Sequence, residues 1–350
     1  MPQTAGSGAK SLPRIDVLVP AIEKDLHTLP RVIRSVRSQV RHPIGQIIIV
    51  APRKDSIISL CRSNGWRFVD ENTVLPLGKK DIHYRSARWE RSGWLFQQLL
   101  KLSGDKLCSA DYFLVIDADT VLIRPHIFRT GGRTTFYTRS WTQPEYLRMH
   151  TRLMGRKASA PRSLVTHYML FEKKKLREMK SDIEARHGMS WYQAILSKLN
   201  RKQQFGFSEY ETYGNFVYSR DPGSIRLLTA QNRALHSGVY SLTPERTKEL
   251  AAKYRSVSFH QRRGYVRKAS TAVKSNLKSK LPAGTFFGAG VTREGAPLIS
   301  SRGRSAIWLS AVYQSRLETR GKAVSVKQAH QPLKAATAIQ RTMSSRGGSR

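Results

Sequence analysis

The sequence predicts an α/β fold with a doubly wound, mostly parallel sheet. Short apolar runs typical of buried strands alternate, up to about Arg129, with segments whose apolar residues recur at helical spacing. Strands that alternate with helices pair in parallel, and the connections between parallel neighbours are right-handed. Beyond Arg129 the pattern becomes mixed, which predicts a second half of less regular topology.

The elements of the first part are expected in strict alternation. Strands are predicted for the apolar runs at 15–20, 46–50, 66–69 and 112–116. Helices are predicted for the amphipathic segments at 29–40, 57–64 and 89–102. The run at 112–116 is apolar throughout, as is typical of a strand that is buried on both faces of a sheet.

The second part is expected to mix strands and helices. Strands are predicted at 134–137, 164–170 and 257–259, and helices at 171–186, 191–199 and 244–254. The last of these helices has a well-marked start, because Thr243 is a favourable N-cap and Pro244 occupies the first helical position.

The charge of the chain is extreme. Its 61 Lys and Arg outnumber its 24 Asp and Glu, for a net charge of +37, and this predicts an anionic partner. A phosphate-rich substrate, an acidic lipid surface and a nucleic acid all satisfy that requirement. Cys61 and Cys108 are the only cysteines, which argues against a disulfide framework and against a zinc site made of cysteines.

Two terminal segments flank the predicted domain at 14–261. Residues 1–13 are rich in small residues, are expected to be flexible and lack the apolar stretch of a secretory signal. The basic tail at 262–350 is expected to be largely disordered. Within it, 305–317 is either an amphipathic helix that binds an anionic membrane surface or a helix packed on the domain. No stretch approaches the length of a membrane span, so we expect a cytoplasmic protein, with peripheral attachment to a membrane as the alternative.

Two carboxylates, Asp117 and Asp119, directly follow the buried run at 112–116. Residues two apart in an extended segment point the same way, and α/β proteins bind ligands at the carboxyl ends of parallel strands. The pair therefore predicts a site for Mn²⁺ or Mg²⁺ that also binds substrate phosphates. The alternative is an ordinary turn after a strand, where Asp is common.

Four further residues, with Asp117, are candidates for binding a phosphate-bearing substrate. Pro20 ends the first strand, next to the loop where such sheets often bind a nucleotide. Arg91 suits phosphate, Trp94 offers a flat ring, and Gln97 lies on the same predicted helix. The alternatives are a plain buried strand and a plain amphipathic helix. No G-x-G-x-x-G or G-x-x-x-x-G-K-[ST] motif is present, which argues against a dinucleotide oxidoreductase and a P-loop kinase.

Candidates for catalysis and for the remaining metal ligand come from the second half. His167 lies among polar neighbours in an apolar run, so it is either a substrate contact or a core histidine. Glu209 and Glu211 stand among aromatics, a combination that suits sugar, and one of them can act as a general base. The alternative for this pair is a solvated helix start. His260 is favoured as a metal ligand, with His236 as its competitor, and the alternative is that neither histidine binds a ligand.

In this order the motifs resemble those of GT-A-like glycosyltransferases of bacteria and viruses. The matching motifs are the first strand with its Val-Pro, Gly-Trp-x-x-Gln-Gln, Val-Ile-Asp-Ala-Asp, Val-Thr-His-x-Met and Ser-Glu-Tyr-Glu-Thr-Tyr-Gly-Asn, spread over 15–260. The resemblance implies a nucleotide-diphospho-sugar donor and a divalent ion bound through Asp117 and Asp119. It also implies a glycan or lipid-linked acceptor, a donor-sugar or acceptor pocket around Glu209 and Glu211, and a surface or envelope polysaccharide as product.

Two other functions fit parts of the pattern. A nucleotidyltransferase also uses paired carboxylates and a metal, but the Gly-rich phosphate loop that it needs near the first strand is missing. A nucleic-acid-binding protein would explain the charge of +37, although such a protein gathers its charge on one surface, and here the basic residues are spread along the chain. A nucleic-acid partner is therefore not expected.

Overall fold

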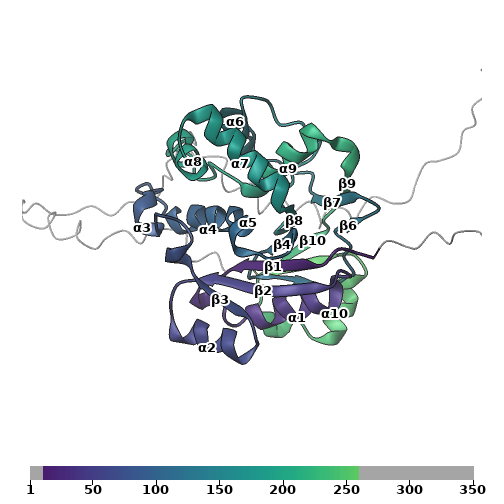
Figure 1. The fold of residues 1–350 in the computed structure, drawn as a ribbon. Helices are drawn as coiled ribbons and strands as arrows, with labels where there is room; N and C mark the ends of the chain where they lie inside the picture. The colour runs from purple at the N-terminus through teal and green to yellow at the C-terminus, as the bar shows by residue number, and fades with distance from the viewer. Residues whose placement is uncertain (1–10, 260–350) are drawn as a thin grey trace, which may run out of the picture. The chain divides into compact units, whose positions relative to one another are not determined.

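A five-stranded sheet with the strand order β3-β2-β1-β4-β8 forms the centre of the protein (Figure 1). Its strands are β1 (Ile15–Pro20), β2 (Ile44–Ala51), β3 (Arg67–Asp70), β4 (Tyr112–Ile116) and β8 (Tyr168–Glu172). This computed structural model describes residues 11–259, which belong to a unit spanning Met1–Ser275. A second unit, Asn276–Arg350, and the predictions made for 1–10 and 260–350 lie outside the described residues.

The strand order creates a place for a ligand. The first four strands are parallel, and β8 runs antiparallel to β4. The chain moves outward from β1 to β2 and β3, and then returns to the other side of β1 to form β4. Such a reversal opens a crevice at the carboxyl ends of the two central strands, here β1 and β4. The predicted α/β fold with a mostly parallel sheet is thus confirmed.

Helices cover both faces of this sheet (Figure 1). One face bears α6 (Pro144–Met154), α7 (Lys173–His187), α8 (Trp191–Lys198) and α9 (Glu209–Arg220), and the other bears α1 (Leu29–Gln39), α2 (Asp55–Ser63) and α10 (Pro244–Ala251). Alternate residues of the strands pack into two separate apolar cores. Phe113 and Val115 of β4 pack on the side of α4 (Ser92–Leu102), while Leu114 and Ile116 pack on the side of α1.

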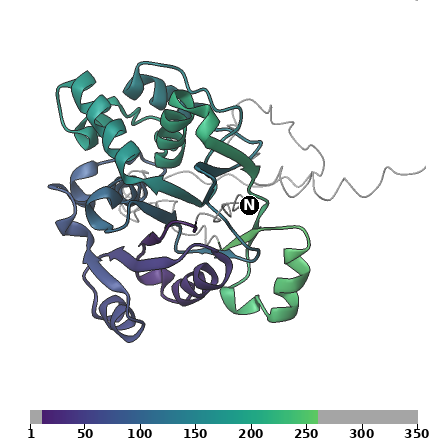
Figure 2. The same ribbon diagram turned by 45° about the vertical axis from the view of Figure 1, so that its right-hand side comes forward.

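Two small sheets complete the described part of the chain. One contains β5 (Thr120–Leu122), β10 (Asn232–Leu235) and β11 (Ser256–Phe259), and the other contains β6 (Arg129–Thr130), β7 (Arg133–Thr138) and β9 (Ile225–Thr229). In Figures 1 and 2 the light green segment around α10 lies beside α1. The Arg31 side chain of α1 donates a hydrogen bond of 2.7 Å to the carbonyl of Leu242, just before α10.

Several predicted boundaries were wrong for identifiable reasons. The strand predicted at 164–170 begins only at Tyr168, because the N–H of Leu164 is bound by a side chain instead of a neighbouring strand. The helix predicted from Trp89 starts at Ser92, since the N–H of Arg91 donates to the carbonyl of Tyr84.

Other local features were predicted correctly or overlooked. Thr243 does cap α10, because its hydroxyl accepts a hydrogen bond from the N–H of Arg246 at 3.2 Å. Helix α6 was not predicted, although Pro144 at its start and Gly155 just after its end mark it in the sequence. None of the helices in residues 11–259 is both long and apolar enough to cross a membrane.

The packing of the short helix α5 (Gly104–Leu107) on the sheet gives a test of this fold. A Cβ atom on Gly104 would lie 2.2 Å from the buried ring of Phe113, which is itself stacked on Phe171. We predict that Gly104→Ala lowers the free energy of unfolding by about 1–3 kcal/mol, as overpacked cores do. Gly223→Ala is the matched control, because no atom crowds that position, and it should change stability by about 0.5 kcal/mol or less.

Both values come from urea denaturation followed by circular dichroism. Equal stabilities for the two variants would show that α5 does not pack on β4 in this way.

Candidate active site

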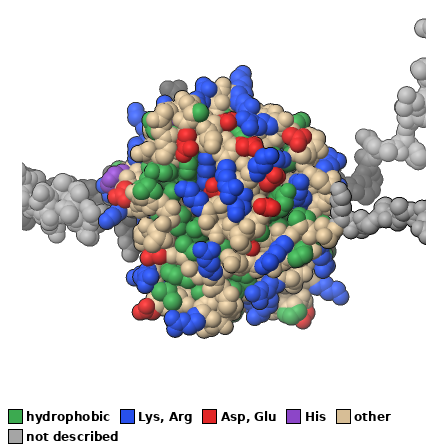
Figure 3. Space-filling model, in the orientation of Figure 1, with side chains coloured by type: hydrophobic (Ala, Val, Ile, Leu, Met, Phe, Trp, Pro, Cys, Tyr) green, Lys and Arg blue, Asp and Glu red, His purple; other side chains and the backbone are tan. Residues whose placement is uncertain are grey.

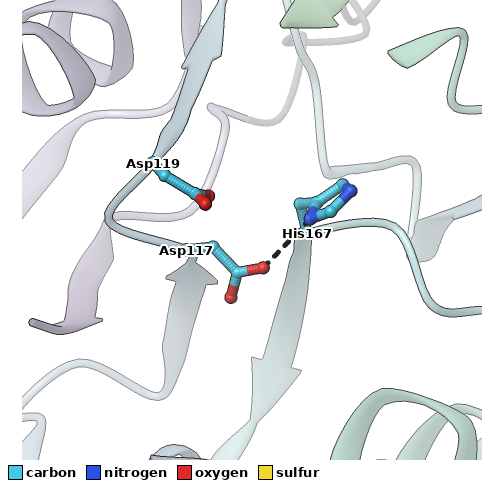
Figure 4. A group of neighbouring side chains, drawn as sticks. All are labelled: Asp117, Asp119 and His167. Carbon is cyan, nitrogen blue, oxygen red and sulfur yellow. Dashed lines mark hydrogen bonds and ion pairs between the residues drawn. The ribbon is translucent and has the colours of Figure 1, made fainter. Parts of the chain in front are cut away.

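Asp117, Asp119 and His167 form a candidate metal site, and no other group of this kind was found among the described residues. One ligand atom from each side chain lies within 4.8 Å of the other two. Figure 4 shows the three side chains pointing toward one another, with the two carboxylates on the loop after β4 and the imidazole on the segment that enters β8. All three residues are half-buried, so the site is open to a small ligand.

The antiparallel pairing of β4 and β8 brings these residues together. Ile116, the last residue of β4, pairs with Tyr168, the first residue of β8. Asp117, which follows β4, therefore faces His167, which precedes β8. The N–H of Asp117 donates to the carbonyl of His167 at 2.9 Å. His167 has a φ of 69°, which non-glycine residues rarely adopt and which is common at functional sites. Its Nδ1 lies 3.1 Å from Oδ2 of Asp117.

The loop that carries the two carboxylates is held from both sides. The Thr28 hydroxyl, at the start of α1, donates to the carbonyl of Ala118 at 2.8 Å. From the other side, the N–H of Phe259 in β11 donates to the carbonyl of Asp119 at 2.9 Å. A loop fixed at successive residues keeps its side chains in place before any ligand arrives.

Lys101 of α4 links the metal site to α9. It is only 4% exposed, and its Nζ lies 2.6 Å from Oδ1 of Asp117 and 2.8 Å from Oε1 of Glu209. The Tyr210 hydroxyl lies 3.4 Å from the same nitrogen. Sequence reasoning missed this residue. The signal was a single lysine in the apolar stretch at 99–102, where a plain core helix would have no charge.

These contacts set the charges of the site. Burial raises the pKa of Asp117, but the Lys101 ammonium and the hydrogen bond from His167 outweigh it and hold that pKa well below its usual range. Burial lowers the pKa of Lys101, but its two carboxylate partners outweigh this and raise it. Burial also raises the pKa of Glu209, although Lys101 opposes the effect. At neutral pH, Asp117 is therefore an anion beside a fixed ammonium.

The residues present fit a divalent ion. The carboxylates of Asp117, Asp119 and Glu209 outnumber the one ammonium of this group, so a cation is favoured electrostatically. In an octahedral shell of radius about 2.1 Å, ligand atoms lie about 3 to 4.2 Å apart. The three ligand atoms all lie within 4.8 Å of one another, which is close to this range. Two carboxylates with one imidazole suit Mn²⁺ better than Mg²⁺, which prefers oxygen alone.

Of the predicted substrate-binding residues, Pro20 and Gln97 lie at the carboxyl end of β1, and Arg91 and Trp94 contact each other at the start of α4. Nε2 of Gln97 donates to the carbonyl of Pro20 at 3.3 Å, which joins α4 to the carboxyl end of β1. The guanidinium of Arg91 lies over the rings of Trp94, at 4.0 Å, and Phe205, at 4.8 Å. Arg91 is buried, so its charge is held within an aromatic cluster at the start of α4.

The two glutamates have different surroundings. Glu209 reaches the metal site through Lys101, whereas Glu211 accepts hydrogen bonds from the N–H of Leu164 at 2.8 Å and the hydroxyl of Ser163 at 3.3 Å. They are 3% and 2% exposed, so the interpretation of this segment as a solvated helix start is wrong.

Of the two histidines proposed to complete the metal shell, only His236 lies among the residues that the structure describes. His236 is exposed and does not belong to the group of Asp117, Asp119 and His167, and His260 lies outside the described residues. His167, which was predicted to contact substrate or to catalyse, instead lies where a third metal ligand would be expected.

A further carboxylate, Asp25, was not predicted. It follows β1, is 8% exposed and accepts a hydrogen bond of 3.0 Å from the N–H of Ile22. Burial raises the pKa of Asp25 to about 6, and the negative charges of Asp119 and Asp117 add to that effect. An acid after a strand is too common in sequences to have marked it.

Comparison with known proteins assigns the chain to a family. Residues 29–260, more than half of the chain, match the family described as Family of unknown function (DUF6492). The chain belongs to this family. The match contains the group of Asp117, Asp119 and His167, whereas Pro20 and Asp25 precede it. No curated protein matches.

Solved structures give only a distant likeness. A galactosyltransferase, LgtC, in complex with donor and acceptor sugar analogs has a TM-score of 0.38 and 13% identity, over 70% of this chain and 87% of that chain. Mouse xyloside xylosyltransferase 1 has a TM-score of 0.40 and 12% identity, over 71% and 98%. Glucosyl-3-phosphoglycerate synthase from Mycobacterium tuberculosis, with Mn²⁺ and uridine diphosphate, has a TM-score of 0.32 and 15% identity, over 62% and 70%. Similarity at this level carries no argument about what this chain does.

The raised pKa of Asp25 predicts a pH-dependent effect on stability. The native state binds the proton of Asp25 more tightly than the unfolded state, whose pKa is near 3.8. The stability of the protein therefore falls, through this group, as the pH rises from about 4 to about 6. Asp25→Asn keeps an acceptor for the N–H of Ile22 and removes the titration. We predict that, in chelator, this variant is more stable than the natural protein at pH 7 by about 3 kcal/mol.

The advantage should fall as the pH is lowered from 6 to 4 and vanish below about pH 3, where the natural carboxyl is protonated in both states. The measurement is the melting temperature of both proteins at several pH values. A stability difference that does not change with pH would contradict the assigned surroundings of Asp25.

Proposed function

We propose that this protein is a metal-dependent glycosyltransferase that moves a sugar from a nucleotide-diphospho-sugar to a glycan or lipid-linked acceptor. The observation that carries the proposal is the group of Asp117, Asp119 and His167 at the carboxyl end of β4. It lies beside the crevice that the strand order opens between β1 and β4. The order of the motifs around it, from Asp-Ala-Asp to Ser-Glu-Tyr-Glu-Thr-Tyr-Gly-Asn, gives the same interpretation.

The residues of the site have different roles in this proposal. Asp117, Asp119 and His167 would hold Mn²⁺, or Mg²⁺ as the second choice. The bound ion supplies positive charge to the diphosphate and to the nucleotide that leaves. Lys101 fixes one oxygen of Asp117, so the other oxygen stays turned toward His167. The nucleotide lies in the crevice by Pro20 and Gln97.

The glutamates support this arrangement in different ways. Glu209 acts on Asp117 through Lys101 and is the better candidate for an effect on turnover. Glu211 orders the backbone at 163–164, which leads to His167. A cytoplasmic location and attachment to an anionic membrane stay predictions, because the segment at 305–317 lies outside the described residues.

The surface gives little support to nucleic-acid binding. On the face displayed in Figure 3, Lys and Arg side chains are scattered, with acidic side chains between them. A nucleic-acid-binding domain needs its positive charge on one surface or along one element. The nucleotidyltransferase alternative uses the same metal site and differs in the atom attacked, so analysis of the product distinguishes it.

The first test concerns the metal. We predict that the protein consumes a uridine-diphospho-sugar only with Mn²⁺ or Mg²⁺, and that Asp119→Asn reduces the rate by about 100-fold, as expected for losing a group that stabilises charge. The same variant should bind Mn²⁺ more weakly in isothermal titration calorimetry. Asp111→Asn is the matched control, because it removes an exposed carboxylate from the other end of β4.

Full activity in excess chelator would refute the metal assignment. A product that carries a nucleotidyl group instead of a sugar would favour the nucleotidyltransferase.

The second test separates the two glutamates. Glu209→Gln should lower kcat and kcat/KM together, because Lys101 loses the charge that helps to position it against Asp117. Glu211→Gln should chiefly raise KM, because the loop at 163–164 loses a charged acceptor. Melting temperatures establish that both variants are folded. Wild-type kinetics in both variants would mean that the acids of α9 serve the fold alone.

A further inference from the structure

Arg139 and Trp141, on the segment after β7, form an exposed platform. Trp141 is 42% exposed, which is unusual for a side chain of its size. The Arg139 guanidinium lies over the Trp141 ring, 4.7 Å from its centroid. An exposed indole offers an apolar surface and a polar edge, which together suit the mixed surface of a sugar ring. A guanidinium beside it offers a planar set of donors to a carboxylate or a phosphate.

Arg139 also has a donor that the described residues leave unused. Its Nε is buried and has no hydrogen-bond partner among them. A buried charged donor without an acceptor is costly, so it points to a ligand that brings the acceptor. Burial lowers the pKa of Arg139, although Tyr146 and Glu211 act to raise it. An anion that bound the guanidinium would relieve this unfavourable burial.

The platform is tied to the metal site through the backbone. The N–H of Arg139 donates to the carbonyl of Ser163 at 3.0 Å, and the Ser163 hydroxyl donates to Glu211. His167 follows Ser163 by four residues, which span at most about 14 Å. The platform therefore lies within the reach of a short saccharide from the metal site.

Its position favours the acceptor over the donor. The donor diphosphate is expected on the ion, beside the crevice between β1 and β4. Strand β7, which leads to Arg139, packs against β8, the edge strand on the far side of β4 from β1. A ligand on the platform would thus approach the metal site from the side opposite the nucleotide.

We propose that Arg139 and Trp141 form an acceptor subsite for an anionic sugar, that is, a sugar ring that bears a carboxylate or a phosphate. The ring lies on the exposed part of Trp141, and the anionic group accepts hydrogen bonds from the Arg139 guanidinium. This inference rests on the proposed function and names the class of its acceptor. A neutral sugar leaves the buried Nε of Arg139 unpaired, so the subsite discriminates against it.

Binding is tested first, because it needs no donor. Saturation-transfer NMR of the full-length protein with the diamagnetic ion Mg²⁺ should detect glucuronic acid and glucose 6-phosphate, but glucose only weakly. Arg139→Gln should lose both anionic signals, and Arg139→Lys, which keeps the charge but not the Nε donor, should be intermediate. Trp141→Ala should weaken all three sugars. Arg226→Gln is the matched control, because it removes an exposed arginine from the neighbouring strand β9.

Transfer is tested next, with the same three sugars as acceptors and uridine-diphospho-glucose and uridine-diphospho-galactose as donors. We expect kcat/KM to favour an anionic acceptor by about 10-fold to 100-fold, the size of a hydrogen bond to a charged group. Arg139→Gln should abolish this preference by raising the KM for the anionic acceptors. Comparison of kcat/KM for glucuronic acid and for glucose 6-phosphate then identifies whether the subsite prefers a carboxylate or a phosphate.

The outcomes separate the two proposals. Binding that depends on Arg139, in a protein that consumes no nucleotide-sugar even without acceptor, supports the subsite and contradicts the proposed function. Donor consumption with equal binding and equal transfer of all three sugars, in the natural protein and in both Arg139 variants, overturns the subsite and leaves the proposed function standing.

Discussion

The buried ammonium of Lys101 is the interaction on which the site depends. Taking a charge out of water costs several kcal/mol, and two carboxylates in contact with it offset that cost. The partners come from three parts of the fold: Lys101 from α4, Asp117 from the end of β4 and Glu209 from the start of α9. Because neither carboxylate can be moved without leaving a buried charge unpaired, these three elements are fixed relative to one another.

A second constraint is the reversed direction of β8. Had this strand run parallel to β4, its first residue would lie at the opposite edge of the sheet, far from Asp117. Its antiparallel course instead places His167 beside the carboxylates, in a backbone conformation that the surrounding pairings impose. Glu211 contributes at a distance, since it replaces the missing strand partner of Leu164. The irregular segment at 163–167 is therefore anchored at Leu164 by Glu211 and at the His167 carbonyl by Asp117.

These two constraints mark the limit of what the sequence could predict. The regular part of the sheet and the pair of Asp117 and Asp119 follow from local patterns, because strand periodicity and the end of an apolar run are visible in a few neighbouring residues. The contact of Lys101 with Glu209 joins positions 108 apart, and the pairing of β8 with β4 is set by register. The single lysine in the apolar stretch at 99–102 is a local signal of burial but does not name its partners, and the register of β8 leaves no local signal. His167 was therefore placed in a strand and Lys101 in a plain helix.

The hydrogen bond from Phe259 to the carbonyl of Asp119 has a consequence for biosynthesis. The two residues are separated by 140 positions, and β11 is the last described strand. On a ribosome that adds about 5–20 residues per second, Asp119 emerges about 7–28 s before the strand that secures its loop. For that interval the carboxylates belong to a nascent chain without a finished site. The candidate metal site therefore reaches its final geometry only after β11, the last of the described elements, has been synthesised.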